Sequence, residues 1–275
     1  GYWSHRAVLS APEVDIAVLE TARGGILKRG LAYDACTVGV VLNVSDDHLG
    51  MEGVGTVGQL ARVKELVAAC ATGAAVLNAD DQHCVAMARR IGRGAELIYF
   101  SLDPVNTAMR EHIRAGGRAL YLDGAGLVIA SGADRRILMA AADIPSTLGG
   151  RARYNIANSL AAAAALLGAG FEDADIVAGL SSFVSDAQSN PLRTNLFEVR
   201  GITVVVDYAH NPAAYASLAE MARAMTQGAV VGVVTSPGDR RDEELDHTGR
   251  TCGAGFDKLV VYESASRGRP YGEAA

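Results

Sequence analysis

The sequence predicts an α/β protein whose core is a mostly parallel β-sheet. Short apolar runs, of the length that buried parallel strands have, recur in the first part of the chain. Segments with apolar residues at helical spacing separate the later runs, at 56–70 and 82–91. Such alternation is typical of a doubly wound sheet with helices on both faces. The predicted strands are 14–19, 38–44, 74–77 and 97–100.

The pattern changes after Tyr99, where short β-rich pieces replace the longer alternation. Asp123-Gly124, a pair that favours a tight turn, separates two of these pieces. Two helices are predicted next, and glycines end the first of them. We therefore expect a first domain, residues 1–190, whose sheet carries a hairpin extension. The predicted elements are β-rich pieces at 119–122 and 127–129 and helices at 154–167 and 173–180.

A second α/β domain is predicted after a polar, linker-like segment at 185–191. Apolar runs and helical patterns alternate again beyond it, which indicates the same class of structure. We expect this domain to cover residues 191–275. The predicted elements are strands at 195–199, 203–206, 230–234 and 258–262 and helices at 212–225 and 243–252.

Composition and charge argue against two classes of partner. The chain of 275 residues has a formal net charge of −6, so it offers no general electrostatic attraction to nucleic acid or anionic membranes. No apolar run approaches the roughly 20 residues that span a bilayer. Cys36, Cys70, Cys84 and Cys252 form no CxxC pair, and we interpret them as core or surface thiols in a reducing compartment. We therefore expect a cytoplasmic protein that binds neither nucleic acid nor membranes.

Polar side chains follow five of the predicted strands directly. Ligands of open α/β sheets bind beyond the carboxyl ends of the strands, so this repetition predicts a cleft between two domains. The residues are Glu20; Asp46, Asp47 and His48; Asn78, Asp80 and Asp81; Asp207 and His210; and Ser236 and Asp239.

The first of these groups couples Glu20 to Arg23 and to Gly24-Gly25. The glycines would let backbone N–H groups approach an anion, so a phosphate or carboxylate beside Mg²⁺ would fit. The alternative is a strand-to-helix turn with an internal ion pair between Glu20 and Arg23.

The second group offers three oxygen or nitrogen ligands in one short loop, which suits Mg²⁺ that bridges phosphate oxygens. A helix-capping turn is the alternative. Lys64 follows on a predicted helix among apolar neighbours, where burial would lower its pKa and allow reaction with carbon dioxide to a carbamate. A surface lysine whose stem packs on apolar neighbours is the simpler interpretation.

Two further strand ends suit a nucleotide and a charged substrate. Asp207 and His210 lie between a buried strand and Pro212, which can open a helix, and their groups suit ribose and base. Asp239, Arg240 and Arg241 follow the strand at 230–234, although a solvated charged loop would have the same sequence.

Six strings in the chain occur in the same order in one known family. On these strings the whole chain resembles the Mur-ligase-like region of cyanophycin synthetases. The resemblance implies a Mur-ligase-like central domain, truncated at its N-terminal side, and a Rossmann-like C-terminal domain, truncated at its C-terminal side. The strings are ETARGGIL, GVVLNVSDDHLG, VLNADD, TLGGRARYNIAN, VVVDYAHNP and SPGDRRDE.

The resemblance also implies an activity, that of an ATP-dependent carbon–nitrogen ligase. Such a ligase would convert an aspartate side-chain carboxylate to an acyl phosphate, which the amine of arginine then attacks. The implied cofactors are ATP and Mg²⁺, and the implied partners are a cyanophycin primer or polymer and arginine. The full-length protein is expected to be a homo-oligomer. No general base is nominated, because positioning and charge neutralisation dominate this kind of catalysis.

Roles for individual residues follow from the same resemblance. Glu20 and His48 match magnesium-binding positions beside Asp47, and Lys64 aligns with a lysine that is carbamylated in many Mur ligases. Arg193, together with these three, forms the expected catalytic set. Nucleotide binding is expected of Asn78, Asp81, Asn155, Asn158, Arg193, Asp207 and His210, and substrate binding of Arg23, Asp239 and Arg240.

Two departures from the family pattern affect these expectations. The Gly-x-x-Gly-Lys-Thr phosphate loop that the family carries upstream is not found, and the chain begins at Gly1 without Met, so we expect a fragment. The usual Pro-Gly-Arg reads Pro191-Leu192-Arg193, which keeps the guanidinium and replaces a hinge residue. A non-catalytic binding or oligomerisation module and a Mur relative that adds another amino acid remain the alternatives.

Overall fold

The chain folds into two units, which the computed structural model describes for residues 1–45, 52–92, 94–263 and 266–274. Unit 1 comprises residues 1–140 and 157–178, and unit 2 comprises residues 141–156 and 179–275. Helix α6 (Arg153–Gly168) begins in unit 2 and continues in unit 1. The boundary between domains that we expect at residue 190 stays a prediction.

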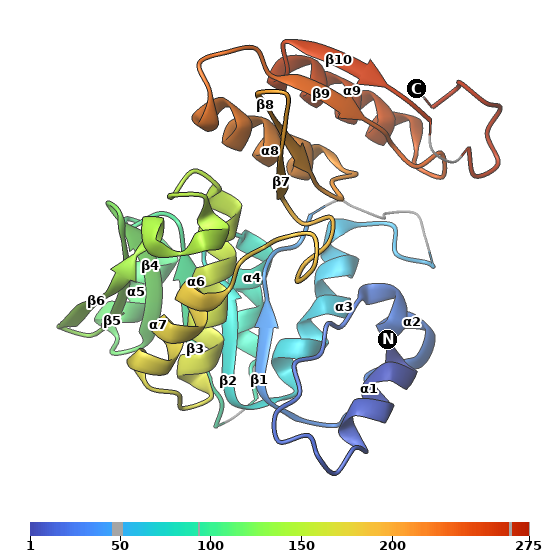
Figure 1. Ribbon diagram of the computed structural model, residues 1–275. Coiled ribbons are helices and arrows are strands. Elements are labelled where there is room, and N and C mark those ends of the chain that lie inside the picture. Colours follow the sequence, from blue (N-terminus) through green and yellow to red (C-terminus); the bar gives the residue numbers. More distant parts are fainter. Residues whose placement is uncertain (46–51, 93, 264–265, 275) are drawn as a thin grey trace. The chain divides into compact units, whose positions relative to one another are not determined.

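Unit 1 is built on a six-stranded sheet whose strands lie in chain order (Figure 1). The first four strands pair in parallel, and the last two add an antiparallel extension, which confirms the predicted class of fold. The last strand is not predicted by its sequence, because Asp134, Arg135 and Arg136 open it and give it the charged character of an edge strand. The strands are β1 (Cys36–Val41), β2 (Ala71–Asn78), β3 (Glu96–Ser101), β4 (Arg118–Asp123), β5 (Gly126–Ser131) and β6 (Asp134–Ala140).

Three helices connect the parallel strands, and each begins at a polar cap. Thr56 forms a capping box with Gln59, while the side chains of Asp81 and Asn106 cap the next two helices. The apolar sides of these helices pack against one face of the sheet to form the core of unit 1. The helices are α3 (Val57–Ala69), α4 (Gln82–Met87) and α5 (Thr107–Arg114), and the core includes Leu60, Leu77, Cys84, Tyr99, Met109 and Tyr121.

Two glycines let helices approach the sheet closely. A Cβ atom on Gly39 of β1 would lie 2.1 Å from the carbonyl oxygen of Val67 in α3. A Cβ atom on Gly168 of α6 would lie 2.7 Å from the Cβ of Ala74 in β2. Successive strand residues face opposite sides, and Ala75 belongs to the core beneath α3, so α6 covers the other face. Within the described residues, no helix is both long and apolar enough to cross a bilayer.

The predicted strand at 14–19 is wrong, because this segment forms neither helix nor strand. It lies between α1 (Tyr2–Leu9) and α2 (Arg23–Arg29). Its β-branched residues are exposed, with Val14, Ile16 and Val18 at 38%, 66% and 95% of full accessibility. Apolar alternation indicates strand propensity, but a strand also needs a hydrogen-bonding neighbour, and β1 pairs only with β2 in the described sheet.

Unit 2 contains two small sheets instead of one continuous sheet. A hairpin of β7 (Asn195–Val199) and β8 (Ile202–Val206) precedes a parallel pair of β9 (Val231–Val234) and β10 (Lys258–Val261). Tyr215 and Cys252, from the helices between these strands, pack with Val234 to form a core. The remaining elements are α8 (Pro212–Met225), α9 (Asp242–Gly255), two short 3-10 turns at Ala141–Asp143 and Pro145–Thr147, and α7 (Asp173–Ser182), which runs from unit 1 into unit 2.

Candidate functional site

Three side chains in unit 1 converge on the backbone just after β1. We call residues 42–44 the β1-exit segment. Asn78 Nδ2 donates to the Leu42 carbonyl at 2.9 Å, and Lys64 Nζ donates to the Asn43 carbonyl at 2.8 Å. Val44 N donates to Asp81 Oδ2 at 2.5 Å. The segment that leads towards His48 is therefore held at three successive residues by α3, the end of β2 and the start of α4.

Asp81 joins two elements through its two carboxylate oxygens. While Oδ2 accepts from Val44 N, Oδ1 accepts from the backbone N–H groups of His83 and Cys84 at 2.8 and 3.1 Å and so caps α4. The structure shows both Asp81 and Asn78 bonded to backbone groups, and their expected role in nucleotide binding stays a prediction.

Asp80, the neighbour of Asp81, ties the end of β2 to the end of β3. Its Oδ1 accepts from Ser101 Oγ at 2.5 Å, and its Oδ2 accepts from Leu102 N at 2.7 Å. Ser101 is fully buried, so this hydrogen bond satisfies a hydroxyl that would otherwise be costly to bury. The carboxyl ends of β1, β2 and β3 are thus linked edge to edge by side chains.

Glu20 lies shortly before α2, and Arg23 is the first residue of that helix. The alternative interpretation of this segment was an ion pair between the two side chains, but the structure pairs Arg23 with another carboxylate. Arg23 pairs with Glu52, with Nη1 to Oε2 at 3.7 Å, and Lys28 approaches the same carboxylate at 2.8 Å. The Glu20 carbonyl accepts a hydrogen bond from His5 Nε2 at 2.9 Å. Glu20 itself is exposed, and its carboxylate forms no ion pair among the described residues.

The predicted magnesium site is only partly within the described chain. Asp46, Asp47 and His48 lie outside the described residues. Among the residues that are described, no group of three His, Cys, Asp or Glu side chains could hold a metal ion. Glu20 and Lys64 are the members of the expected metal set that the structure places, and the roles of both stay predictions.

In unit 2, a chain of hydrogen bonds links Asp207 to the first turn of α6. Asp207 Oδ2 accepts from Thr194 N at 2.8 Å and from Thr194 Oγ1 at 3.0 Å. The hydroxyl of Tyr154 lies 2.7 Å from Thr194 Oγ1. Burial raises the pKa of Tyr154 to about 12, against the opposing effect of its hydrogen bond to Thr194, so the phenol stays protonated at neutral pH.

Arg193, next to Thr194, is exposed and lies near the ring of Tyr208, which in turn contacts the ring of His210. Its guanidinium carbon is 6.0 Å from the centroid of Tyr208, and the rings of Tyr208 and His210 meet edge to face at 5.6 Å. His210 Nδ1 lies 2.9 Å from the Tyr208 carbonyl oxygen, which orients the imidazole. Three residues expected to contact a nucleotide, namely Arg193, Asp207 and His210, therefore gather around the end of β8.

The backbone of this region is strained at two residues before β7. Leu192 has φ +62° and Thr194 has φ +54°, both in the left-handed region that favours glycine. Asn195 supports the turn, since its Oδ1 accepts from Leu192 N at 2.7 Å and its Nδ2 donates to the Asn190 carbonyl at 3.0 Å. The leucine that replaces the family's glycine thus occupies a conformation that glycine adopts more easily.

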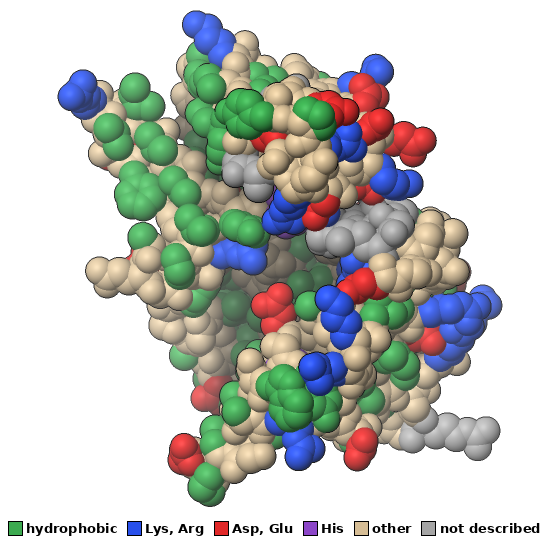
Figure 2. Space-filling model, turned by 90° about the vertical axis from the view of Figure 1, so that its right-hand side faces the viewer, with side chains coloured by type: hydrophobic (Ala, Val, Ile, Leu, Met, Phe, Trp, Pro, Cys, Tyr) green, Lys and Arg blue, Asp and Glu red, His purple; other side chains and the backbone are tan. Residues whose placement is uncertain are grey.

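The charged loop after β9 is organised by arginines from the end of the chain. Arg267 Nη1 lies 2.8 Å from Asp239 Oδ2, and Arg269 donates to the Gly238 and Arg240 carbonyls at 2.8 and 2.7 Å. Burial raises the pKa of Asp239, but the hydrogen bond and charge of Arg267 outweigh it and hold the pKa below its ordinary value. Figure 2 shows that basic and acidic side chains are also intermixed over one face of the molecule.

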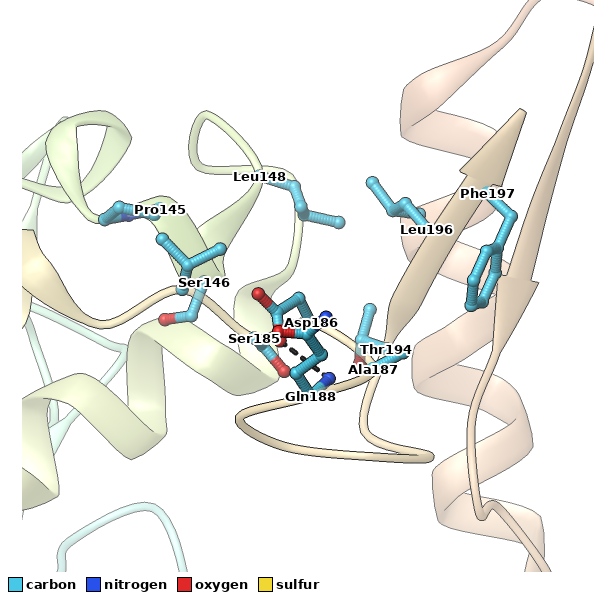
Figure 3. Close-up of a pocket in the computed structure, with 11 residues that line it drawn as sticks. Pro145, Ser146, Leu148, Ser185, Asp186, Ala187, Gln188, Thr194, Leu196 and Phe197 are labelled. Carbon is cyan, nitrogen blue, oxygen red and sulfur yellow. Dashed lines mark hydrogen bonds between the residues drawn. The ribbon is translucent and has the colours of Figure 1, made fainter.

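Unit 2 contains a pocket whose lining includes Ser146 and Thr194 (Figure 3). The pocket encloses about 500 Å³, a volume typical of small-molecule sites. Asn155 Nδ2 donates at 2.7 Å to the carbonyl of Ser146, which lines the pocket. Thr194, whose backbone N–H donates to Asp207, also lines the pocket. Asn158 follows three residues later on α6. Leu148, Leu196 and Phe197 supply the apolar part of the lining.

Several residues that shape these regions carry no sequence signal as site residues. Thr194 and Tyr154 act through hydrogen bonds to distant partners, and Asn43 acts through its carbonyl. Arg267 and Arg269 act on a loop that lies some 30 residues earlier in the chain. Only proximity in the fold reveals these roles, because residue type and spacing do not specify a partner.

Comparisons with known proteins agree with the two-part organisation. Residues 5–166 match the family model of the Mur ligase middle domain, and residues 192–275 match that of the Mur ligase glutamate ligase domain. The whole chain is 43% identical to a cyanophycin synthetase of Crocosphaera subtropica and 42% identical to one of Trichormus variabilis. It spans 32% and 31% of the lengths of these relatives, about a third of each.

The fold also resembles a solved structure of lower sequence identity. E. coli FolC, in complex with ADP, superimposes with a TM-score of 0.56 at 18% identity, over 84% of this chain and 48% of that one. At this identity the likeness concerns the fold.

Proposed function

Since the chain belongs to the Mur ligase family, we propose that it is part of an ATP-dependent carbon–nitrogen ligase of the cyanophycin-synthetase type. The substrates would be the aspartate side-chain carboxylate of a growing polymer and the amine of arginine. The observation that carries the proposal is the 43% identity to a cyanophycin synthetase over 100% of this chain. The ordered series of strings from 20–27 to 236–243 supports it further.

The chemistry requires that a carboxylate, a poor electrophile, is activated before an amine attacks it. Transfer of the γ-phosphoryl group of ATP to the carboxylate gives an acyl phosphate and ADP. The arginine amine then adds to the acyl carbon, and inorganic phosphate leaves as the amide forms. A protein accelerates both steps chiefly by positioning the reactants and by stabilising charge on phosphoryl oxygens and the tetrahedral oxyanion.

We assign the positioning of the phosphate end to the β1-exit segment and its three supports. Lys64, Asn78 and Asp81 hold consecutive backbone groups of residues 42–44. Such support fixes the backbone at the end of β1, which is the requirement for a preorganised charge-binding site. Arg23, close to Glu52 and Lys28, is proposed to face an anionic group of a substrate.

Glu20, His48 and Lys64 are the residues proposed to hold Mg²⁺. The exposed Glu20 carboxylate, which has no ion pair among the described residues, suits a hard cation. The hydrogen bond from Lys64 Nζ to Asn43 is compatible with a lysine ammonium and with the N–H of a carbamate. When bound, the metal would neutralise charge on the phosphate oxygens.

Nucleotide binding is also proposed for residues of unit 2. Arg193 presents an exposed guanidinium beside Tyr208 and His210, and Asp207 lies at the end of β8. The pocket in Figure 3 adjoins this region through Ser146 and Thr194, and Asn155 supports its wall. Asn158 is assigned to the same nucleotide. The ADP complex of FolC, which has the same fold, supports nucleotide binding by this architecture.

A titration separates the ligase from a non-catalytic module. Mg·ATP should bind to a version of the chain extended upstream to include any encoded phosphate loop, and Arg193→Ala should weaken that binding at least tenfold. Arg200→Ala, an exposed arginine between β7 and β8, is the matched control and should leave binding unchanged. Absence of ATP binding in the extended protein would favour the non-catalytic module.

Amino acid specificity needs a separate measurement. Phosphate release by the extended protein with a cyanophycin primer should depend on arginine and should not respond to glutamate or diaminopimelate. Release with either of the latter amino acids, and not with arginine, would identify a Mur relative that adds another residue.

A further inference from the structure

Two of the four cysteines, separated by 34 residues in sequence, meet at one end of the unit 1 sheet. Cys36 begins β1, and Cys70 ends α3 as its C-cap. Their Sγ atoms lie 3.5 Å apart, and Cys36 N also donates to the Cys70 carbonyl at 3.0 Å. The other two cysteines, Cys84 and Cys252, are buried elsewhere.

The backbone around the pair is fixed by hydrogen bonds on both sides. Cys36 is paired in register with Ala71 of β2, and Thr72 Oγ1 donates to the Cys36 carbonyl at 3.1 Å. A disulfide requires the two sulfurs to approach to about 2.05 Å from main chains that lie about 5 to 6 Å apart. The two sulfurs start 3.5 Å apart, and the hydrogen bond from Cys36 N to the Cys70 carbonyl keeps the two main chains adjacent.

We propose that Cys36 and Cys70 are a modification site, a thiol pair that an oxidising disulfide such as oxidised glutathione converts to an intramolecular disulfide. Both thiols are partly exposed, so a small oxidant can reach them. Cys84 lies at the other end of β1, where its buried thiol donates to the Val41 carbonyl at 3.8 Å.

The reaction is a pair of thiol–disulfide exchanges. Burial, together with the hydrogen bond to the Cys70 thiol, raises the pKa of Cys36 to about 12. The thiolate of one cysteine of the pair attacks one sulfur of oxidised glutathione and releases one glutathione thiolate. The other cysteine then loses its proton, attacks the cysteine sulfur of the mixed disulfide and releases the second glutathione. The cysteine pair is oxidised by two electrons, glutathione disulfide is reduced, and the two protons end on two glutathione molecules.

The disulfide would close a covalent loop of residues 36–70, which contains the whole β1-exit segment. Within this loop lie β1, the β1-exit segment and α3 with Lys64. β1 and α3 are already joined near the strand's carboxyl end by the bond from Lys64 to Asn43. A disulfide at the opposite end would pin the same strand and helix at two points, and loop closure of this length should raise the melting temperature by up to about 10 °C.

The test is peptide mapping after incubation with oxidised glutathione and blocking of the remaining thiols. Trypsin places Cys36 in the peptide 30–62 and Cys70 in the peptide 65–89, so the disulfide joins these two. Because 65–89 also contains Cys84, the informative protein is Cys84→Ser, in which a link between the peptides can involve only Cys36 and Cys70. Cys84→Ala is the substitute if the buried serine impairs folding, which circular dichroism reports.

The expected result is a linked pair of peptides in the parent protein and in Cys84→Ser, with a rise in melting temperature that dithiothreitol reverses. Cys36→Ser and Cys70→Ser should each lose both signals. Glutathione adducts without a link, or a link that disappears in Cys84→Ser, would overturn the proposal. Neither readout involves ATP or an amino acid, so the result does not depend on the ligase activity.

Discussion

Two segments that precede proposed site residues are held in different ways. The β1-exit segment has ordinary backbone angles, and three side chains from three elements satisfy its polar groups. The turn at 191–194 instead places Leu192 and Thr194 in the left-handed region, at φ +62° and +54°. The first segment is restrained by hydrogen bonds, whereas the second holds conformational strain that Asp207 and Asn195 counteract.

This difference has a physical consequence for motion. A segment held by several hydrogen bonds without strain changes shape only when those bonds break, so it suits a site that must stay fixed. A strained turn is closer in free energy to other conformations, so its shape depends on the hydrogen bonds that hold it, here those of Asp207, Asn195 and Ser185. We infer that rearrangement of the turn at 191–194 is easier than rearrangement of the β1-exit segment.

The largest effect is expected when the shared support of the β1-exit segment is removed. Asp81→Ala would leave Val44 N and the first N–H groups of α4 without acceptors. Loss of a helix cap and of one part-buried hydrogen bond should together lower the free energy of unfolding by about 3 kcal/mol. Urea denaturation measures the change.

Asp81→Asn is the matched control for this effect. An amide retains one oxygen to cap α4 but presents an NH₂ group to one of the two sites, so it should cost less than Asp81→Ala. If Asp81→Ala unfolds at the same urea concentration as the parent, the three-point support of the segment contributes nothing, and the contrast with the strained turn fails.

A smaller effect is expected from the restraint on the strained turn. Asp207→Ala removes the acceptor of both Thr194 N and Thr194 Oγ1. Thr194 is buried, at 5% of full accessibility, so water does not readily replace that acceptor. The change should lower the free energy of unfolding by about 2 kcal/mol.

Asp207→Asn separates structure from nucleotide binding. The amide oxygen can still accept from Thr194 N, so most of the stability should return, while a requirement for the negative charge in ATP binding would persist. Equal stability of Asp207→Ala and the parent would show that the turn does not need this restraint.

The strain itself should be visible at Leu192. Leu192→Gly removes the steric cost of the left-handed conformation, about 2 kcal/mol, at the expense of a more flexible unfolded chain, about 1 kcal/mol. Leu192→Ala is the control, because it removes the same side-chain contacts but keeps Cβ. We expect the glycine variant to exceed the alanine variant in stability by about 1 kcal/mol, whereas an alanine variant of equal stability contradicts strain at this residue.

Sequence patterns predict a helix or strand well where the residues of that helix or strand alone determine whether it forms. The hairpin strand at 195–199 and the helix at 212–225 coincide with β7 and α8, because alternation and the Asn211-Pro212 start are local signals. The strand at 14–19 is wrong since pairing depends on a neighbour, and β6 and α5 go unpredicted since their surfaces carry much charge.

The candidate site shows the same contrast between local signals, which the sequence reveals, and contacts that depend on a distant partner. Polar residues at strand ends are visible in the sequence, so Lys64, Asn78 and Asp81 could be selected as site residues. That all three act on the backbone of 42–44 could not be predicted, because residue type indicates what a side chain can bond and not which group the fold brings to it. The contact between Cys36 and Cys70 was missed for the same reason.

The smallest predicted effect concerns a third way to hold a strand, by a charged pair at the start of the β9–β10 sheet. Asp257 Oδ2 accepts from Arg223 Nη1 at 2.6 Å and from Val230 N at 2.7 Å. The hydrogen bond of Arg223, with that of Val230 N, lowers the pKa of Asp257 to about 2. Because this value lies below the value of about 3.9 in an unfolded chain, the stabilisation is complete above pH 4 or so and is lost as the pH falls towards 2.

Asp257→Asn should therefore flatten the dependence of unit 2 stability on pH in that acid range, as followed by denaturation at a series of pH values. Asp246→Asn removes a surface carboxylate that pairs with Arg250 on α9 and serves as the control, with the parent's pH dependence retained. An unchanged slope in Asp257→Asn would mean that the charge of this residue does not hold the strand. The unit 2 sheet would then depend on hydrogen bonds alone, as the β1-exit segment is proposed to do.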